Sequence, residues 1–373
     1  MILTIISHTP HYLSDNEIVG WGPTISEINN LTNLFSKIYH VAPLYKEESP
    51  ESSLPYNSKK IIYVPIEPSG GNGIIKKLKI FLKMFNNLVR IHNSCNLSDW
   101  VHFRAPTNLG LYVLPYLLII RKKKYWIKYA GNWNQTNAPL SYRLQKFWLN
   151  NVVKKSKVTI NGKWPNQKKH LLSFENPCLS KNELIHSRKQ ILHKNYLGLL
   201  DICFVGSLAR TKGVGYVISA LKNIEDLSSI KSVYIVGDGP DKKKYETEAK
   251  SIKNIPIVFT GALSRNDLNL IYSKCQILIL PSDSEGFPKV ISESAAYGCV
   301  SIVSDVGSIK HYLNKANGIL LKKSNADGVS SALIYLLKNR TVLKKLANNC
   351  YELSRKFTYE RYNERIKNMI LNQ

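Results

Sequence analysis

Short apolar runs and amphipathic segments alternate along the chain. The first run, Ile2–Ile6, is typical of a buried strand, and a polar stretch at residues 7–23, which contains Gly20 and Gly22, follows it. Thr24 with Glu27 three residues later has the pattern of a capping box, and it opens a segment whose apolar residues recur at helical spacing. The start of the chain therefore predicts a strand, a glycine-bearing loop and a helix.

The same order continues through the first half of the chain. Helical periodicity occurs at residues 74–91 and 142–153. Strands are predicted by apolar runs at residues 39–42, 60–65, 100–103, 125–129 and 158–161. The break at Asn176-Pro177 indicates the end of this domain.

A second series of strands and helices fills the other half. It follows a hydrophilic segment, residues 180–194, which we interpret as a linker. Strands are predicted at residues 199–206, 233–236, 258–261, 277–280 and 300–303. Two such series predict an α/β fold with two Rossmann-like, doubly wound domains, at residues 1–180 and 181–355. Residues 356–373 predict a terminal helix capped by Thr358.

Polar residues follow two strands of the first domain. In open α/β sheets ligands bind at the carboxyl ends of the strands, so these loops, together with Gly20 and Gly22, are candidates for an acceptor or cleft surface. The candidate side chains are Arg104, Asn132, Trp133 and Asn134. The alternative is structural: Arg104 pairs with a carboxylate and Trp133 packs in the core.

The stretch at residues 280–307 carries the clearest chemistry of the second domain. Glu285 and Gly286 lie in a turn after a predicted strand, and Pro288 occupies a position that suits the first residue of a helix. The unpaired N–H groups of the first helical turn, including those of Val290 and Ile291, favour a phosphate in that loop. With Glu293 further along the helix, the stretch predicts an anion site flanked by two carboxylates, which suits a nucleotide sugar.

A second loop, residues 206–213, predicts a similar site. It follows a predicted strand and precedes a helical segment, and it places Arg210 and Lys212 near the start of that helix. A helix N-terminus with two cations beside it favours a phosphate for the same physical reason.

Charge narrows the class of partner. The chain of 373 residues carries 52 Lys and Arg against 26 Asp and Glu, a formal charge of +26, which favours anionic membranes, nucleic acids or phosphorylated substrates. The basic residues are spread over both halves and no nucleic-acid recognition motif occurs, so nucleic acid is the less favoured partner. The six cysteines form no C-x-x-C pair, which argues against a metal or redox site.

The basic amphipathic segment at residues 74–91 has two interpretations. It is either an ordinary helix packed on the core or a helix that lies on an anionic bilayer, with the basic run at 121–124 as support for the second. No apolar run approaches the ~18 residues needed to span a bilayer. The N-terminus also lacks the features of a signal peptide. The sequence therefore predicts a cytoplasmic protein, with peripheral attachment to the inner face of the membrane as the open question.

Several ordered motifs carry a family resemblance. They are residues 206–213, Val236-Gly-Asp-Gly-Pro240, Phe259-Thr-Gly261, and Pro281-Ser-x-x-Glu-Gly-Phe-Pro288 followed by Glu293. Together they resemble the group 1 glycosyltransferases, the family-four retaining enzymes of the GT-B fold. The resemblance implies an acceptor-binding domain and a donor-binding domain facing each other across a cleft, with the terminal helix returning to the first. It also implies a nucleoside diphosphate sugar as donor and no metal cofactor.

The resemblance implies a role for each motif residue. Glu285 would bind hydroxyls of the donor sugar, with the backbone of Gly286, Phe287 and Pro288 beside it. Glu293 would bind the ribose, and Lys212 and the amides of Val290 and Ile291 would bind the diphosphate. The loops at Gly206, Gly237 and Gly261 would complete the donor site.

Two positions depart from the family pattern. The family usually has an arginine directly after the first glycine of the 206–213 loop, where this chain has Ser207, and Arg210 is the candidate replacement. The family often has a histidine near the reacting centre, but the loop after residue 129 reads A-G-N-W, so Asn132 is the candidate for that place. The weaker candidates are His8, His11 and His102.

The acceptor follows from the resemblance and the basic charge alone. We expect a lipid-linked saccharide in bacterial surface polysaccharide synthesis. The alternatives are a nucleotide-sugar epimerase of the same fold and an inactive scaffold that binds polyanions or membranes.

Overall fold

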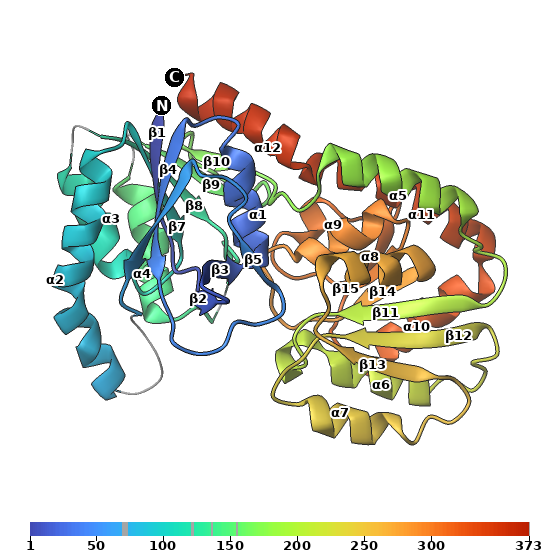
Figure 1. Cartoon of the computed structure of the whole chain (residues 1–373). Coiled ribbons are helices and arrows are strands. Elements are labelled where there is room, and N and C mark those ends of the chain that lie inside the picture. The colour runs from blue at the N-terminus through green and yellow to red at the C-terminus, as the bar shows by residue number, and fades with distance from the viewer. Residues whose placement is uncertain (69–73, 121–122, 136, 154–155, 373) are drawn as a thin grey trace. The chain divides into compact units, whose positions relative to one another are not determined.

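The computed structural model describes residues 1–68, 74–120, 123–135, 137–153 and 156–372, and at 74–82 the backbone alone. The chain divides into two compact units (Figure 1). The first unit combines Met1–Glu175 with Tyr359–Gln373, and the second is Asn176–Thr358. The sequence analysis placed the corresponding boundaries at residues 180 and 355.

Among the described residues, the first unit holds a parallel sheet of seven strands in the order β10-β9-β8-β7-β1-β4-β6. The first strand lies inside the sheet and the chain winds outward from it in both directions, which is the doubly wound arrangement. The strands are β1 (Ile2–Ile6), β4 (Lys37–Pro43), β6 (Ile61–Ile66), β7 (Trp100–Ala105), β8 (Lys124–Tyr129), β9 (Lys157–Ile160) and β10 (Leu171–Ser173).

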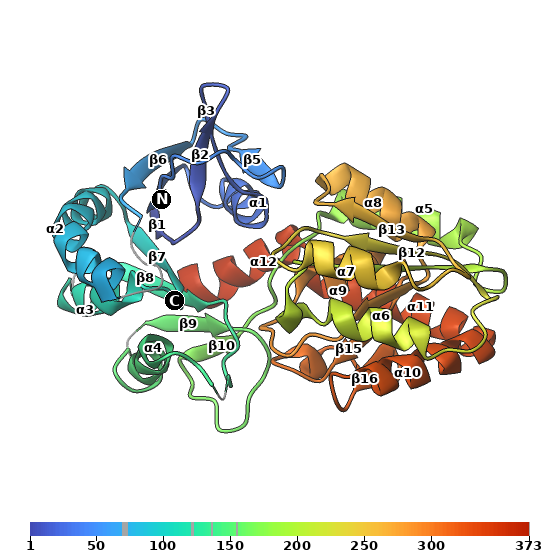
Figure 2. The same cartoon turned by 90° about the horizontal axis from the view of Figure 1, so that it is seen from below.

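Both faces of this sheet are buried, and β7 shows how the sequence achieves it. Val101 and Phe103 pack in one hydrophobic cluster with Ile91 of a helix, whereas Trp100 packs in another cluster with Ile28 and Ile366. Successive side chains of a strand point to opposite faces, so a continuous apolar run serves a sheet covered on both sides. The helices are α1 (Gly22–Leu31), α2 (Ile74–Asn96), α3 (Gly110–Ile119), α4 (Leu140–Asn151) and α12 (Tyr359–Ile366). In Figure 2, α2 and α3 lie on one side of the sheet and α1 and α12 on the other.

The polar stretch at residues 7–23 was predicted to be a loop, but the structure shows that it contains two strands. It forms an antiparallel hairpin, β2 (His11–Ser14) and β3 (Glu17–Trp21), to which β5 (Ser53–Pro55) adds a third strand. The two-residue turn is Asp15-Asn16, with φ values of 49° and 63°. Asp and Asn tolerate positive φ, and such turns match the twist of a hairpin. The short strands lacked an apolar run long enough to predict.

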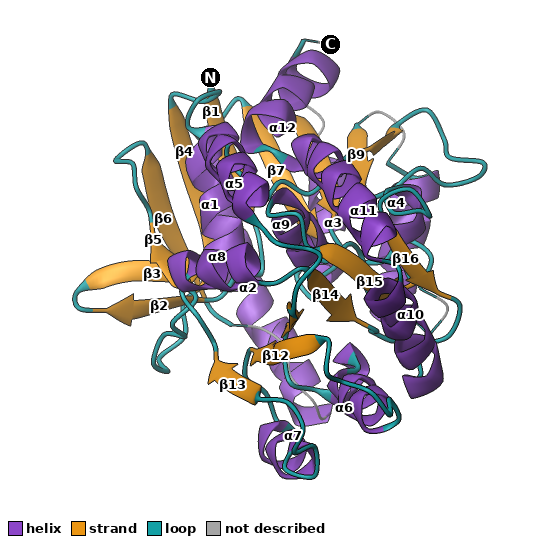
Figure 3. Cartoon of the chain, turned by 90° about the vertical axis from the view of Figure 1, so that its right-hand side faces the viewer, coloured by secondary structure: helices purple, strands orange, loops and turns teal. Residues whose placement is uncertain are grey.

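The second unit has a six-stranded parallel sheet within the described residues, in the order β13-β12-β11-β14-β15-β16 (Figure 3). The order reverses between β11 and β14, so their carboxyl ends mark the topological switch point. The strands are β11 (Leu200–Val205), β12 (Ile230–Val236), β13 (Ile257–Gly261), β14 (Ile277–Leu280), β15 (Val300–Ser304) and β16 (Gly318–Leu321). The helices are α5 (Lys181–His193), α6 (Val214–Lys222), α7 (Lys242–Ala249), α8 (Arg265–Lys274), α9 (Lys289–Ala296), α10 (Ala326–Lys338) and α11 (Arg340–Ser354).

The prediction of a linker at residues 180–194 was wrong, because helix α5 occupies most of this segment. The Ser180 side chain accepts a hydrogen bond from the Glu183 amide, and the Glu183 carboxylate accepts one from the Ser180 amide. This is a complete capping box. Leu184 and Ile191 form a narrow buried stripe on one side of α5. The other residues of this helix are mostly polar, so the apolar pattern was too weak to predict a helix.

The basic amphipathic segment is part of α2, as its periodicity predicted. The side chains of its first residues lie outside the described residues, as do residues 121–122 of the basic run. In the described part, Ile91 is buried while Phe85 and Val89 are exposed. No helix among the described residues has the length and apolar character required to cross a bilayer.

Candidate functional site

Lys212 and Glu285 meet at the switch point of the second unit. Lys212 ends a short 3-10 turn, Arg210–Lys212, in the loop after β11, and Glu285 lies in the loop after β14. The Lys212 Nζ atom is 2.6 Å from the Glu285 Oε1 atom. The side chain of Lys212 is 32% exposed and that of Glu285 is 11% exposed. The structure thus joins two residues 73 positions apart into an ion pair that solvent reaches.

Two glycines let these loops approach one another closely. Gly213 has a φ of 81°, and a Cβ atom there would collide with the carbonyl oxygen of Pro281. Gly237 has a φ of 132°, and a Cβ atom there would collide with the carbonyl oxygen of Gly206. Positive φ and backbone contact both require glycine. The Gly237 amide also donates to the carbonyl of Gly261 at 2.8 Å, which joins the loops after β12 and β13.

The loop that carries Glu285 is held from both sides. The Asp283 amide donates to the Thr211 carbonyl at 2.9 Å. The amide and hydroxyl of Ser308 both donate to the Gly286 carbonyl at 2.9 Å. Phe287 is buried and stacks on Phe357 with ring centroids 4.7 Å apart. The Phe287 side chain therefore anchors the loop.

The start of α9 corrects one detail of the prediction. Pro288 is the N-cap residue, and the helix begins one position later at Lys289. The Ile291 amide donates to the Pro288 carbonyl at 3.2 Å, so it is not the unpaired donor that the sequence analysis expected. The short first turn satisfies this amide locally. Val290 remains the candidate amide donor of the two.

Glu293 lies in α9 and forms a second ion pair. Its Oε1 atom is 2.7 Å from Nη1 of Arg265, and its Oε2 atom accepts a hydrogen bond of 3.5 Å from the Tyr272 hydroxyl. Arg265 also contacts Glu183 at 3.3 Å and donates to the Cys178 carbonyl at 2.9 Å. Arg265 was not among the residues predicted from the sequence. Its position directly after the β13 loop, behind the N-cap Ser264, was the available signal.

Ser207 stands where the group 1 pattern usually has an arginine, and Arg210 is the candidate replacement; both residues lie at the surface. Ser207 and the Arg210 side chain are exposed in the loop after β11. The Arg210 amide donates to the Asp241 carboxylate at 2.8 Å. This bond fixes the turn that presents Arg210 beside Lys212.

In the first unit, Arg104 takes the structural alternative. Arg104 Nη1 and Lys128 Nζ each lie 2.7 Å from the Glu27 Oε1 atom, and all three side chains are 10% exposed or less. The Tyr362 hydroxyl of α12 donates to the same oxygen at 3.1 Å. This cluster, called the Glu27 cluster below, ties α1, β7, β8 and α12 together.

Gly20 and Gly22 also lie in packed positions. Gly20 of β3 has no room for a Cβ atom beside the His11 ring, and the Gly22 amide at the start of α1 donates to the Ser52 carbonyl at 3.1 Å.

The candidate histidines differ in their surroundings. His102 is fully buried and stacks on Trp126 at 4.3 Å, and burial holds its pKa well below the usual value. His11 and His40 both bond the Tyr56 hydroxyl, at 2.7 and 2.6 Å. Burial lowers the pKa of His11 to about 4, so it is neutral near pH 7. His8 is exposed in the loop after β1.

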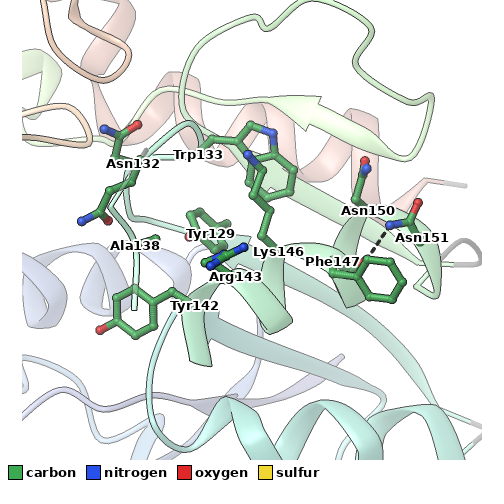
Figure 4. Close-up of a pocket in the computed structure, with 11 residues that line it drawn as sticks. Tyr129, Asn132, Trp133, Ala138, Tyr142, Arg143, Lys146, Phe147, Asn150 and Asn151 are labelled. Atoms are coloured by element: carbon green, nitrogen blue, oxygen red, sulfur yellow. Dashed lines mark hydrogen bonds between the residues drawn. The ribbon is translucent and has the colours of Figure 1, made fainter. Parts of the chain in front are cut away.

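Asn132, Trp133 and their neighbours line a groove of about 330 Å³ in the first unit (Figure 4). One wall is the end of β8 with the segment that follows it, which contributes Tyr129, Asn132, Trp133, Gln135 and Ala138. The other wall is one side of α4 and contributes Tyr142, Arg143, Lys146, Phe147, Asn150 and Asn151. We call it the α4 groove.

Trp133 both packs and lines this groove. It is 7% exposed, its ring meets Tyr129 edge-on at 5.0 Å, and the Lys146 Nζ atom lies 5.3 Å from its centroid. Lys146 also donates to the Asn134 side chain at 3.1 Å. The Asn132 side chain accepts a hydrogen bond of 3.0 Å from the Asn134 amide, which fixes the turn. Lys146 and Arg143 were not predicted, because neither belongs to a motif.

Comparison with known proteins identifies most of the second unit. Residues 190–357 match the family model described as glycosyl transferases group 1. Over these residues the chain is similar to the group 1 glycosyl transferases. An uncharacterized glycosyltransferase of Methanocaldococcus jannaschii is 31% identical over 159 residues, which are 42% of this chain and 44% of that protein. The putative teichuronic acid biosynthesis glycosyltransferase TuaC of Bacillus subtilis is 28% identical over 149 residues, 40% of this chain and 36% of that protein. The chain thus spans less than half the length of either relative.

The fold of the whole chain is similar to that of a solved structure. The Anabaena protein HepE, in complex with UDP-glucose, matches with a TM-score of 0.72 at 13% identity, and the match covers 100% of both chains. The two Rossmann-like units are those of the GT-B fold, as the resemblance implied. Lys212, Arg265, Glu285 and Glu293 lie inside the matched glycosyl transferase residues, whereas the α4 groove lies outside them.

Proposed function

We propose that the protein is a retaining glycosyltransferase that moves a sugar from a nucleoside diphosphate sugar to a saccharide acceptor. The observation that carries this proposal is the Lys212–Glu285 pair at the switch point of the group 1 domain. A cation and a carboxylate side by side suit a ligand with a diphosphate next to a hydroxyl-bearing sugar. The UDP-glucose complex of HepE, which shares the fold, supports a nucleotide sugar as donor.

When the donor binds, Lys212 and Glu285 would give up their contact with each other, and each would contact the donor. The Lys212 ammonium would turn to the diphosphate, and the Glu285 carboxylate would accept hydrogen bonds from sugar hydroxyls. As the bond between sugar and diphosphate breaks, negative charge grows on the phosphate oxygens. Lys212, Arg210 and the Val290 amide would stabilise that charge, and loss of one such donor costs ~3–4 kcal/mol of activation free energy.

Metal independence is part of the proposal, because these groups already supply positive charge where the leaving group needs it. We expect the rate of transfer to stay the same in the presence of EDTA. A rate that collapses with EDTA and returns with Mg²⁺ would contradict this element. Retention is tested separately, by the NMR coupling constant of the anomeric proton in the product.

We further propose that the acceptor is a lipid-linked saccharide in surface polysaccharide synthesis, and that the protein works at the cytoplasmic face of the membrane. The name of TuaC, which places that relative in teichuronic acid biosynthesis, supports the pathway class. The net charge of +26 and the exposed Phe85 and Val89 of α2 support attachment to an anionic membrane. Flotation with anionic liposomes at low salt tests it, and a protein that stays unbound would contradict it.

The test of the proposed function starts from the donor. A thermal-shift panel of UDP-, GDP-, dTDP- and ADP-sugars identifies the nucleotide, and mass spectrometry then follows transfer to short-chain lipid-linked saccharides. We expect a product whose mass grows by one sugar and loss of that product in Lys212→Met. Conversion of the nucleotide sugar to its epimer without an acceptor would instead show an epimerase.

A further inference from the structure

The α4 groove has a composition that points to a class of ligand. Of the described residues that line it, none is acidic, two are cations, four are aromatic and four carry a primary amide. Aromatic faces and amides are the groups that bind sugar rings and hydroxyls, and the cations add a preference for negative charge. The cavity of about 330 Å³ lies at the lower end of the ~300–1,000 Å³ range of ligand pockets, which suits one or two sugar units.

The two cations of the groove differ from Arg104 and Lys128 of the Glu27 cluster. Arg104 and Lys128 share the Glu27 carboxylate, each at 2.7 Å. Within the described part of the chain, neither Arg143 nor Lys146 has a carboxylate within ion-pair distance. Burial also removes water from the Lys146 ammonium and so lowers its pKa. An anionic ligand would supply what the protein does not.

The groove is also held in shape. Lys146 is fixed between the Trp133 ring and the Asn134 side chain, and Trp133 is held by Tyr129. Figure 4 shows Lys146 beside Trp133, with Asn132 on the facing loop. The Lys146 ammonium is therefore already held over the Trp133 ring, so little side-chain freedom would be lost when a ligand binds.

We propose that the α4 groove binds an anionic saccharide, a sugar unit that carries a carboxylate or a phosphate, as part of the acceptor. The inference rests on the proposed function, since it treats the groove as acceptor surface. Lys146 and Arg143 contact the anionic group, and the amides of Asn132 and Asn150 bind the ring hydroxyls. Neutral saccharides of the same size bind the groove more weakly.

Saturation-transfer NMR with defined probes tests this assignment. The carboxylate probe is a hyaluronan tetrasaccharide with neutral tetra-N-acetylchitotetraose as its match, and the phosphate probe is glucose 1-phosphate with glucose as its match. We expect at least one anionic probe to bind at least tenfold more tightly than its neutral match at low salt. Arg143→Gln/Lys146→Gln should lose that preference, whereas Lys146→Arg should keep it. Equal binding of charged and neutral probes would overturn the proposal.

A matched control and a competing occupant complete the design. Lys59→Gln/Lys60→Gln removes the same charge from an exposed site of the same unit and should leave the preference intact. Vesicles that contain phosphatidylglycerol test a lipid surface. If Arg143→Gln/Lys146→Gln loses vesicle binding while no saccharide binds the wild type, the groove binds a lipid headgroup and the proposal is wrong.

The outcome is separable from that of the proposed function. Probe binding needs no donor and no turnover, and Lys212→Met should leave it unchanged. A protein that binds anionic probes but transfers no sugar would refute the proposed function alone. A protein that transfers sugar with the same acceptor KM in wild type and Arg143→Gln/Lys146→Gln would refute the groove alone.

Discussion

The Glu27 cluster and the Lys212–Glu285 pair use the same chemistry in two different ways. In the first unit one carboxylate receives two cations and a tyrosine hydroxyl, and none of the charged groups is more than 10% exposed. In the second unit the carboxylate and a single lysine lie in loops, with the lysine 32% exposed. A buried cluster of paired charges fixes a structure, whereas a pair open to solvent can be exchanged for a ligand. Under the proposed function, the exposure of the partner cation, more than charge, distinguishes the Glu285 carboxylate from that of Glu27.

Removing the Glu27 carboxylate should have the largest effect of the variants that test this comparison. Glu27→Ala leaves Arg104 and Lys128 buried without their counter-charge, and we expect a loss of about 3–5 kcal/mol in the free energy of unfolding. Urea denaturation followed by circular dichroism measures it. Glu67→Ala is the control in the same unit, because it breaks an exposed pair with Lys83 and should cost about 1 kcal/mol or less. Equal losses in both variants would remove the distinction.

Changing the Lys212–Glu285 pair in the second unit should lower the rate of transfer and leave the free energy of unfolding almost unchanged. For Glu285→Gln and Lys212→Met we expect the transfer rate constant to fall about 100- to 1,000-fold, because each removes a group that we propose to contact the donor. The free energy of unfolding should change by no more than about 1 kcal/mol. Initial rates and urea denaturation are measured on the same preparations. Glu352→Gln, which breaks an exposed pair with Arg355, should leave both unchanged.

The histidines near the first sheet predict a dependence of stability on pH. The pKa of His11 is lowered from 6.5 to about 4 in the folded protein by burial. Below pH 6.5 the unfolded chain therefore binds a proton that the folded chain does not, and stability falls as the pH drops from 6.5 toward 4. We expect His11 to contribute about 1–3 kcal/mol to this loss. His11→Gln should flatten the dependence and the exposed His186→Gln should not; identical slopes would contradict it.

Arg265 gives the smallest expected effect. It holds one oxygen of Glu293 at 2.7 Å, so it positions the carboxylate proposed for the ribose. For Arg265→Gln we expect KM for the donor to rise about threefold to tenfold with little change in kcat, since ground-state binding is lost. Arg265→Lys should restore part of the affinity. A fall in kcat with unchanged KM would place Arg265 elsewhere in the reaction.

The sequence predicted those features that local patterns determine. Continuous apolar runs such as 277–280 and 300–303 became β14 and β15, because strands buried on both faces need apolar residues throughout. The loops at Lys212 and Glu285 were found because motif and strand order agree. The hairpin at 11–21 and helix α5 were missed, since their apolar stripes are narrow.

Pairings across the chain could not be predicted. Glu27 meets Arg104 over 77 positions, Lys128 over 101 and Tyr362 over 335. A single sequence carries no pattern that joins such positions, because the fold alone brings them together. The pairing of Arg265 with Glu183 over 82 positions was missed for the same reason.

Donor binding by the Lys212–Glu285 pair is the central claim, and a thermal-shift comparison tests it most directly. Wild type, Lys212→Met, Glu285→Gln and Glu352→Gln are each scanned with the same panel of nucleoside diphosphate sugars. The account predicts that at least one sugar nucleotide raises the Tm of wild type and Glu352→Gln, and that the rise disappears in Lys212→Met and Glu285→Gln. An equal rise in all four proteins would contradict it.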